Sequence, residues 1–262
     1  SSDSLGFFYG RITGLLGFKP CRHEGKITGL AAYGDNANAL PLMKRMIDFN
    51  GEEIFANLGD FFRPFYSNYS DLLIEEIGKY SKEDISAAAQ AHTENCLTSL
   101  VTKLYEKFDL NDLPLCLAGG IFANVKVNQK LKELDCVSQI FVQPHMGDGG
   151  LAVGSACASL AKRKIQPLFS DSMALGPVGG SNIEINELIS ENKKTVEFER
   201  FEDNNLIERI ITELKNDKVI GLVRGRMEFG PRALCQRSIL YKTSDSSSND
   251  WLNKRMNRTE FM

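Results

Sequence analysis

The stretch from Leu115 to Gly154, LCLAGGIFANVKVNQKLKELDCVSQIFVQPHMGDGGLAVG, decides the fold of this chain. It opens with four apolar residues, Leu115 to Ala118, which is the length of a short buried strand. The strand stops at Gly119-Gly120, because glycine reaches backbone angles that other residues avoid. Helical spacing follows at Ile121, Val125, Asn128 and Leu131. The pattern predicts a strand, a glycine turn and a helix, whose backbone amides can face a phosphate.

The same order of elements follows once more downstream. A second strand, Ile140 to Val142, leads through Pro144 into Gly147-Asp148-Gly149-Gly150 and a helix of small residues. An isolated glycine pair is more often a plain turn, but two in succession favour phosphate binding. Glycines let the backbone approach phosphate oxygens, and a fixed carboxylate can bind a cation that shields their charge. We therefore predict that Gly147 and Gly149 contribute to a nucleotide site and that Asp148 binds a metal.

The composition of the chain sets broad limits on its function. Its 262 residues, 42% of them hydrophobic, suffice for one large domain or for a medium and a small one. Lysine and arginine number 31 against 34 acidic residues, so the net charge of −3 does not indicate nucleic acid or a membrane surface as a partner. No run approaches the roughly 20 apolar residues of a membrane span, and the start lacks a signal-peptide pattern. We expect a soluble protein.

The cysteines and the chain ends carry two further expectations. No CxxC pair occurs among the cysteines, which predicts reduced core residues in a cytoplasmic protein; they are Cys21, Cys96, Cys116, Cys136, Cys157 and Cys235. The chain starts with Ser1 rather than Met and stops at Met262, directly after a helical segment without a capping signal. We expect both ends to be cut from a longer protein.

Charged residues are packed among glycines between Cys21 and Gly34, CRHEGKITGLAAYG. A plain connecting loop has no reason to combine these residues with an apolar patch. One interpretation is that Lys26 reaches a phosphate while Glu24 holds Lys26 or a ribose hydroxyl. The alternative, equally supported by the local sequence, is a helix cap with a surface ion pair.

Apolar periodicity predicts helices over 4–18, over 36–49 and from Ser81 onward, with irregular structure over 54–69. His92 and Cys96 lie on the buried stripe of the helix that follows Ser81. A histidine on an apolar face is usually a hydrogen-bonded core residue rather than a ligand. A polar, glycine-containing stretch over 162–180 then reads as a domain linker. Beyond it we predict helices over 186–190 and 204–215, and strands over 195–201 and 219–223.

The last predicted strand leads into an arginine-rich loop, RGRMEFGPRALCQRS, over 224–238. A guanidinium matches phosphate or carboxylate with two hydrogen bonds, and a loop stiffened by glycine and proline preserves that geometry. A basic surface loop is the alternative, but such a loop rarely sets its charges among Met227, Phe229 and Leu234. We predict an oxyanion pocket in which Glu228 positions Arg226 or Arg232.

Four motifs, in the same order along the chain, resemble the signatures of the NodU/CmcH-type O-carbamoyltransferases. They are EGKITGLAAYG at 24–34, LAGGIFANVKVNQKL at 117–131, VQPHMGDGGLAVGSA at 142–156 and GRMEFGPRALCQRSIL at 225–240. The resemblance implies an α/β chain in two parts. Residues 1–170 would be the C-terminal part of an actin/sugar-kinase-like (ASKHA) ATPase domain akin to that of tRNA threonylcarbamoyl-transfer enzymes. Residues 171–262 would begin an α+β YrdC-like domain.

The resemblance also implies the chemistry. Carbamoyl phosphate and ATP would form carbamoyl-adenylate in the YrdC-like domain. The carbamoyl group would then move to a hydroxyl of a sugar or natural product beside a divalent metal, for which iron, manganese and magnesium all remain open. Gly119, Gly120 and Asn124 match the turn that faces the nucleotide phosphates, and Asp148 matches a metal-binding aspartate. The implied catalytic residues, in the part that receives carbamoyl phosphate and ATP, are Arg226, Arg232, Arg237 and Ser238.

The sequence departs from the family pattern at several points. The family's other metal ligands are histidines upstream of this region, and none of His23, His92 and His145 matches them. Cys235 stands where glycine is usual. We therefore expect residues 1–262 to be inactive alone. A tRNA threonylcarbamoyl-transfer enzyme is the alternative reading, although the net charge gives no tRNA footprint. A non-catalytic nucleotide-binding piece is the other.

Overall fold

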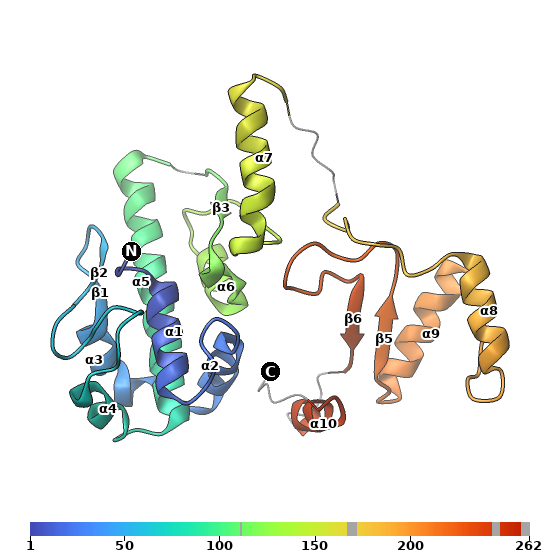
Figure 1. Cartoon of the computed structure of the whole chain (residues 1–262), viewed down its shortest axis with the longest axis horizontal. Coiled ribbons are helices and arrows are strands. Elements are labelled where there is room, and N and C mark those ends of the chain that lie inside the picture. The colour runs from blue at the N-terminus through green and yellow to red at the C-terminus, as the bar shows by residue number, and fades with distance from the viewer. Residues whose placement is uncertain (111, 167–171, 243–246, 258–262) are drawn as a thin grey trace. The chain divides into compact units, whose positions relative to one another are not determined.

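A computed structural model describes residues 1–110, 112–166, 172–242 and 247–257 of the chain (Figure 1). These residues form a mixed α/β structure in which the sheets are small, each with two strands. The chain divides into two compact units, one of Ser1–Gly147 with Ser247–Met262 and one of Asp148–Ser246. The predicted domain boundary at 170–171 lies outside the described residues and stays a prediction. No helix among the described residues combines the length and apolarity needed to cross a membrane.

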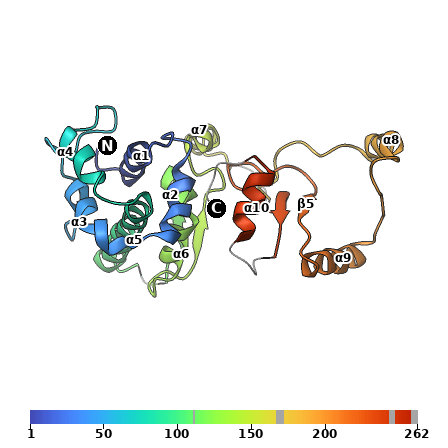
Figure 2. The ribbon, with the colours of Figure 1, turned by 90° about the horizontal axis from the view of Figure 1, so that it is seen from below.

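The first unit is built around one long helix, α5 (Lys82–Phe108), the helix that the sequence predicts after Ser81. The Ser81 hydroxyl caps it by accepting a hydrogen bond from the amide of Asp84. Figure 2 views α5 nearly end-on, with α1, α2 and α3 disposed around it. The other helices of this unit are α1 (Leu5–Leu15), α2 (Glu24–Leu30), α3 (Asn36–Met46), α4 (Asp71–Ile77), α6 (Val125–Lys132) and α10 (Ser247–Arg255), with 3-10 turns η1 (Ala31–Tyr33) and η2 (Gly120–Ala123).

The helix predicted over 36–49 ends at Met46, three residues before its predicted end, because a β-hairpin begins there. Strand β1 (Ile47–Phe49) pairs antiparallel with β2 (Ile54–Ala56), so the last residues of that segment are extended. Ile47 is fully buried while Asp48 and Phe49 are partly exposed. The core of the unit is shared by α5 and the helices packed with it, and includes Phe8, Ile12, Met43, Ile85 and Leu131.

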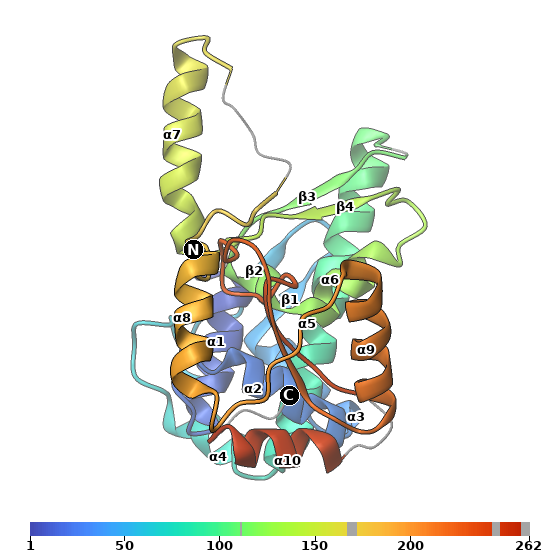
Figure 3. The same ribbon diagram turned by 90° about the vertical axis from the view of Figure 1, so that its right-hand side faces the viewer.

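The stretch from Leu115 to Gly154 contains both predicted strands, but its first helix starts at Val125, because Ile121 belongs to the 3-10 turn η2. Strand β3 (Leu115–Leu117) and strand β4 (Ile140–Val142) pair in parallel, with Leu117 opposite Val142 (Figure 3). The chain crosses between them through η2 and α6. The strands are less buried than the apolar run suggests, because Cys116 and Phe141 are exposed. Their carboxyl ends meet at one edge of the sheet, which is where α/β folds place ligands.

The second unit begins with the 3-10 turn η3 (Asp148–Gly150) and helix α7 (Leu151–Lys162). It continues with α8 (Asn182–Asn192), α9 (Asp203–Lys215) and an antiparallel pair, β5 (Ile220–Val223) with β6 (Arg237–Leu240). The strand predicted over 195–201 is wrong, since these residues are irregular. Alternating apolar residues do not suffice for a strand, because the backbone also needs a neighbouring strand with which to form hydrogen bonds. Among the described residues of this unit, β5 pairs with β6 and not with residues 195–201.

Candidate functional site

The two glycine corners of the first unit are joined at the ends of β3 and β4. The amide of Gly119 donates a hydrogen bond to the carbonyl oxygen of Met146 at 2.7 Å. A methyl group added to Gly147 would come within 4.0 Å of the Cα of Gly120. Gly119 has a φ of +129°, a conformation that essentially only glycine adopts. A methyl group at Gly120 would meet open space, so the backbone there is accessible to a ligand.

Asn124 is the N-cap of α6 and belongs to a buried polar network. Its Oδ1 accepts hydrogen bonds from the amides of Lys126 and Val127, and its Nδ2 donates to Gln90 Oε1 at 2.7 Å. Tyr9 also donates to Gln90 Oε1 at 2.7 Å, and burial raises the pKa of that tyrosine. The side chain of Asn124 therefore accepts the hydrogen bonds of two backbone amides at the start of α6, and these two amides are satisfied within the protein. Its contact with a nucleotide stays a prediction.

Lys26 and Glu24 both lie on α2 but have different surroundings. Glu24 Oε1 accepts a hydrogen bond from the amide of Cys21 at 2.6 Å, which ties down the turn before the helix. Lys26 is buried, and its Nζ lies 5.4 Å from the centre of the Phe18 ring. This bond of Glu24 is local, but the N-cap residue His23 makes no side-chain capping hydrogen bond, so neither interpretation of this stretch is decided. The predicted phosphate contact of Lys26 remains a prediction.

Asp148 and Gly149 belong to the second unit, where they open η3 and are exposed. Divalent cations normally take several protein ligands. Among the described residues, Asp148 is in no cluster of three or more His, Cys, Asp or Glu side chains. Metal binding by Asp148 stays a prediction.

The loop between β5 and β6 is organised around Glu228. Its Oε1 accepts hydrogen bonds from the amides of Leu234 at 2.9 Å, Gln236 at 2.7 Å and Arg237 at 2.9 Å. Burial of the carboxylate favours a raised pKa, but these backbone hydrogen bonds outweigh it and lower the pKa to about 2. The described contacts thus show Glu228 bound to the main chain of the loop, and its predicted positioning of Arg226 or Arg232 stays a prediction.

Two of the predicted arginines bind main-chain carbonyls of the same unit. Arg237 donates to the carbonyl oxygens of Arg224 at 3.0 Å, Gln236 at 2.8 Å and Gly225 at 3.3 Å. Arg226 is exposed and donates to the carbonyl oxygen of Leu175 at 2.9 Å.

The other two predicted catalytic residues are partly buried. Arg232 lies within the loop, and Ser238 lies in β6 opposite Leu222. Since a guanidinium has five N–H donors, the carbonyl bonds of Arg226 and Arg237 leave further donors for an oxyanion.

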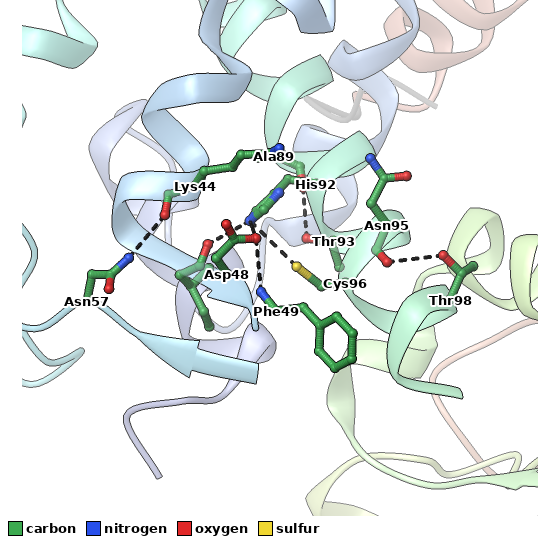
Figure 4. Close-up of polar contacts among 11 residues, drawn as sticks. Lys44, Asp48, Phe49, Asn57, Ala89, His92, Thr93, Asn95, Cys96 and Thr98 are labelled. Atoms are coloured by element: carbon green, nitrogen blue, oxygen red, sulfur yellow. Dashed lines mark hydrogen bonds and ion pairs between the residues drawn. The ribbon is translucent and has the colours of Figure 1, made fainter. Parts of the chain in front are cut away.

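A cluster that the sequence analysis did not assemble lies between β1 and α5 (Figure 4). The ligand atoms of Asp48, His92 and Cys96 all lie within 4.8 Å of one another, a possible metal-binding triad. His92 is 1% exposed and Cys96 is 2% exposed. Burial lowers the pKa of His92, against the opposing effects of the Ile47 carbonyl and the Asp48 charge, so the ring is neutral near pH 7. Burial raises the pKa of the Cys96 thiol to about 12.

Part of this triad has a sequence signal. His92 and Cys96 are four residues apart, which places them on the same face of a helix. The sequence predicts that His92 is a buried core residue, and its burial in the structure confirms this. Asp48 comes from another element, 44 positions before His92, and sequence periodicity does not report contacts of that range.

Comparisons with known proteins agree with the four motifs. Residues 1–157 match the family model described as carbamoyltransferase N-terminus, and residues 211–262 match carbamoyltransferase C-terminus. An uncharacterised protein of Methanocaldococcus jannaschii is 32% identical, over 99% of this chain and 50% of its own. Nodulation protein NolNO of Sinorhizobium fredii is 30% identical, over 99% of this chain and 38% of its own.

A third relative has a chemical name. The 3'-hydroxymethylcephem-O-carbamoyltransferase of Streptomyces clavuligerus is 28% identical, over 94% of this chain and 44% of its own. The chain spans about half the length, or less, of the curated relatives it matches. Since one family model alone covers more than half of its residues, the chain belongs to the carbamoyltransferase family.

Proposed function

We propose that this chain is part of an O-carbamoyltransferase that uses ATP and carbamoyl phosphate, through carbamoyl-adenylate, to carbamoylate a hydroxyl of a sugar or natural product. The observation that carries the proposal is the joined pair of glycine corners at the ends of β3 and β4, in a chain of the carbamoyltransferase family. The name of the Streptomyces relative supports transfer to oxygen. The domain reading, a kinase-like part over 1–170 and a YrdC-like part over 171–262, belongs to the same proposal.

The proposed nucleotide contacts are mainly backbone groups. The open space above Gly120 and the glycine-specific conformation of Gly119 support a turn built for close approach of phosphate oxygens. Asn124 holds the start of α6 in place beside that turn. We also assign to nucleotide binding the residues Lys26, Gly147 and Gly149.

The arginine loop is the proposed oxyanion site. Glu228 fixes the loop backbone through three amides, which preserves the positions from which Arg226, Arg232 and Arg237 project. A preorganised set of guanidinium donors binds phosphate with little loss of entropy on binding. Ser238, on the adjacent strand, is the fourth proposed residue.

In the transfer step the acceptor hydroxyl oxygen attacks the carbamoyl carbon. The bond from that carbon to the adenylate oxygen breaks, AMP leaves, and the hydroxyl proton passes to a base or to solvent. Backbone donors stabilise the negative charge that develops on oxygen. A metal at Asp148, completed by ligands from elsewhere in the protein, would polarise the carbamoyl carbonyl as a Lewis acid.

The test is transfer of labelled carbamoyl from carbamoyl phosphate to a polyol by the complete protein that contains this chain. We expect label in the polyol only when ATP is present, and no transfer by residues 1–262 alone. Transfer without ATP would overturn the adenylate route. Calorimetry that detects ATP binding without any turnover would instead support a non-catalytic nucleotide-binding protein. A tRNA gel shift that survives moderate salt would favour the threonylcarbamoyl alternative.

A further inference from the structure

Three electron-rich atoms converge on one ring nitrogen of His92 in the first unit. Nε2 lies 2.6 Å from the carbonyl oxygen of Ile47, 3.6 Å from Sγ of Cys96 and 3.9 Å from Oδ1 of Asp48. A neutral imidazole carries at most one proton on this nitrogen, so it cannot donate well to all three atoms. A cation placed among them would interact favourably with each donor.

We propose that Asp48, His92 and Cys96 bind a divalent metal ion of the zinc class, which fastens β1 to α5. Imidazole nitrogen, thiolate sulfur and carboxylate oxygen together are a donor set typical of zinc. With metal–ligand bonds of about 2.0–2.3 Å in tetrahedral geometry, neighbouring ligand atoms lie about 3.3–3.6 Å apart. The separation of 3.6 Å between Nε2 and Sγ meets that requirement, while Oδ1 lies 3.9 Å from Nε2 and all three ligand atoms lie within 4.8 Å of one another, so the ion must draw the ligands closer.

The scaffold around these atoms is suited to holding an ion. His92 and Cys96 are one turn apart on α5, whose backbone fixes their spacing. Asp48 Oδ1 accepts a hydrogen bond from the amide of Phe49 at 2.9 Å, which orients the carboxylate. The carbonyl oxygen of Ile47 is a fourth donor atom nearby. It can complete a tetrahedron once it moves away from the ring nitrogen.

Access and proton balance are also compatible with binding. The side chain of Asp48 is 35% exposed, so an ion can enter from solvent on that side although the other two ligands are buried. On binding, the Cys96 thiol releases its proton to solvent, because a coordinating thiol is deprotonated by the ion. The imidazole binds through Nε2 and keeps its one proton on Nδ1, a buried atom that has no hydrogen-bond partner within the described residues. No electron transfer is involved.

The experiment is titration of the chain, residues 1–262, with Co²⁺ and then Zn²⁺, followed by absorption spectroscopy. Tetrahedral Co²⁺ with a thiolate ligand gives visible d–d bands and a near-ultraviolet sulfur-to-cobalt band. We expect both, and expect Zn²⁺ to displace the cobalt and remove them. Cys96→Ser should abolish the sulfur band, and Asp48→Asn should weaken Co²⁺ binding by at least about 10- to 100-fold.

Two matched variants act as controls. Cys136→Ser alters a partly buried cysteine of the same unit and should leave the sulfur band unchanged. Asp148→Asn removes the metal ligand of the proposed function, and since that residue is not near a thiolate in the proposed chemistry, the band should persist. This inference is independent of carbamoyl transfer.

Circular dichroism of each variant reports whether it is folded. Absence of a sulfur-to-cobalt band in the folded wild type, or its survival in folded Cys96→Ser, would overturn the proposed site. If Cys96→Ser does not fold, Asp48→Asn decides: unchanged Co²⁺ affinity in that variant counts against the site.

Discussion

Gln90 on α5 and Asn124 at the start of α6 exchange two side-chain hydrogen bonds. Asn124 Nδ2 donates to Gln90 Oε1 at 2.7 Å, and Gln90 Nε2 donates to Asn124 Oδ1 at 3.3 Å. Both residues are buried, so neither amide has water as a replacement partner. The pair fixes the helix that follows the Gly119 turn against the central helix of the unit.

Removing one member of this pair leaves buried polar groups without partners. We expect Gln90→Ala to lower the free energy of unfolding by about 2–4 kcal/mol, through unpaired groups and a cavity. Urea unfolding followed by circular dichroism measures it. The control is Gln129→Ala, an exposed glutamine bonded to Glu133, which should cost less than about 0.5 kcal/mol. Equal losses in the two variants would contradict the buried-pair argument.

Substitutions at the two glycines of the turn after β3 test different properties, with Gly119 affecting stability and Gly120 affecting ATP binding. Gly119→Ala places a side chain at a φ of +129°, and we expect it to lose about 1–3 kcal/mol of stability. Gly120→Ala meets open space, so it should fold normally yet bind ATP more weakly, because the methyl group stands where phosphate approaches. Calorimetry with ATP measures the second effect. Gly59→Ala, also at an uncrowded position, is the control. Unchanged ATP affinity in Gly120→Ala would argue against the proposed phosphate site.

The Glu228 carboxylate makes stability depend on acid pH. Its pKa is about 2 in the folded chain against 4.5 for an unperturbed glutamate. The folded state therefore binds fewer protons, and the stabilisation is present above pH 4.5 and is lost as the pH falls toward 2. We expect Glu228→Gln to show a flatter fall in urea midpoint over this window than wild type. Exposed Glu197→Gln should follow wild type, and parallel curves for all three proteins would refute the role of Glu228.

The residue that departs from the family pattern in the arginine loop sits in a left-handed backbone conformation. Cys235 has a φ of +69°, a region that costs most residues about 1–2 kcal/mol and favours glycine. Glycine also has more freedom in the unfolded chain, so we expect Cys235→Gly to gain a net of about 0.5 kcal/mol or slightly more. Cys235→Ala keeps the conformational cost and should gain nothing. Thermal unfolding compares the two, and equal melting temperatures would rule out strain as the cause.

Local sequence predicts those parts of the fold that local chemistry controls. The turn at Gly119, the capped start of α5 after Ser81 and the strands β3 and β4 themselves follow from glycine positions, a capping hydroxyl and apolar runs. Long-range contacts were not predictable in this way. The approach of Asp48 to His92 depends on how the β1 hairpin packs on α5, and no periodicity encodes it.

The candidate site shows the same division. Arginines in a stiff loop are visible in the sequence, but Glu228 reaches the main chain of residues six to nine positions away, which depends on how the loop closes. The strand predicted over 195–201 failed for a related reason, because apolar alternation specifies a face and not a partner strand.

Helix α5 carries both Gln90 and His92, and their partners lie in different elements. Residues two positions apart on an α-helix point about 200° away from each other around its axis. The contacts of Gln90 and His92 therefore hold α5 from nearly opposite faces. Any rotation of α5 about its axis would lengthen both sets of contacts at once. Substitutions at the two positions should consequently show non-additive effects on unfolding, as expected for anchors that share one rigid body.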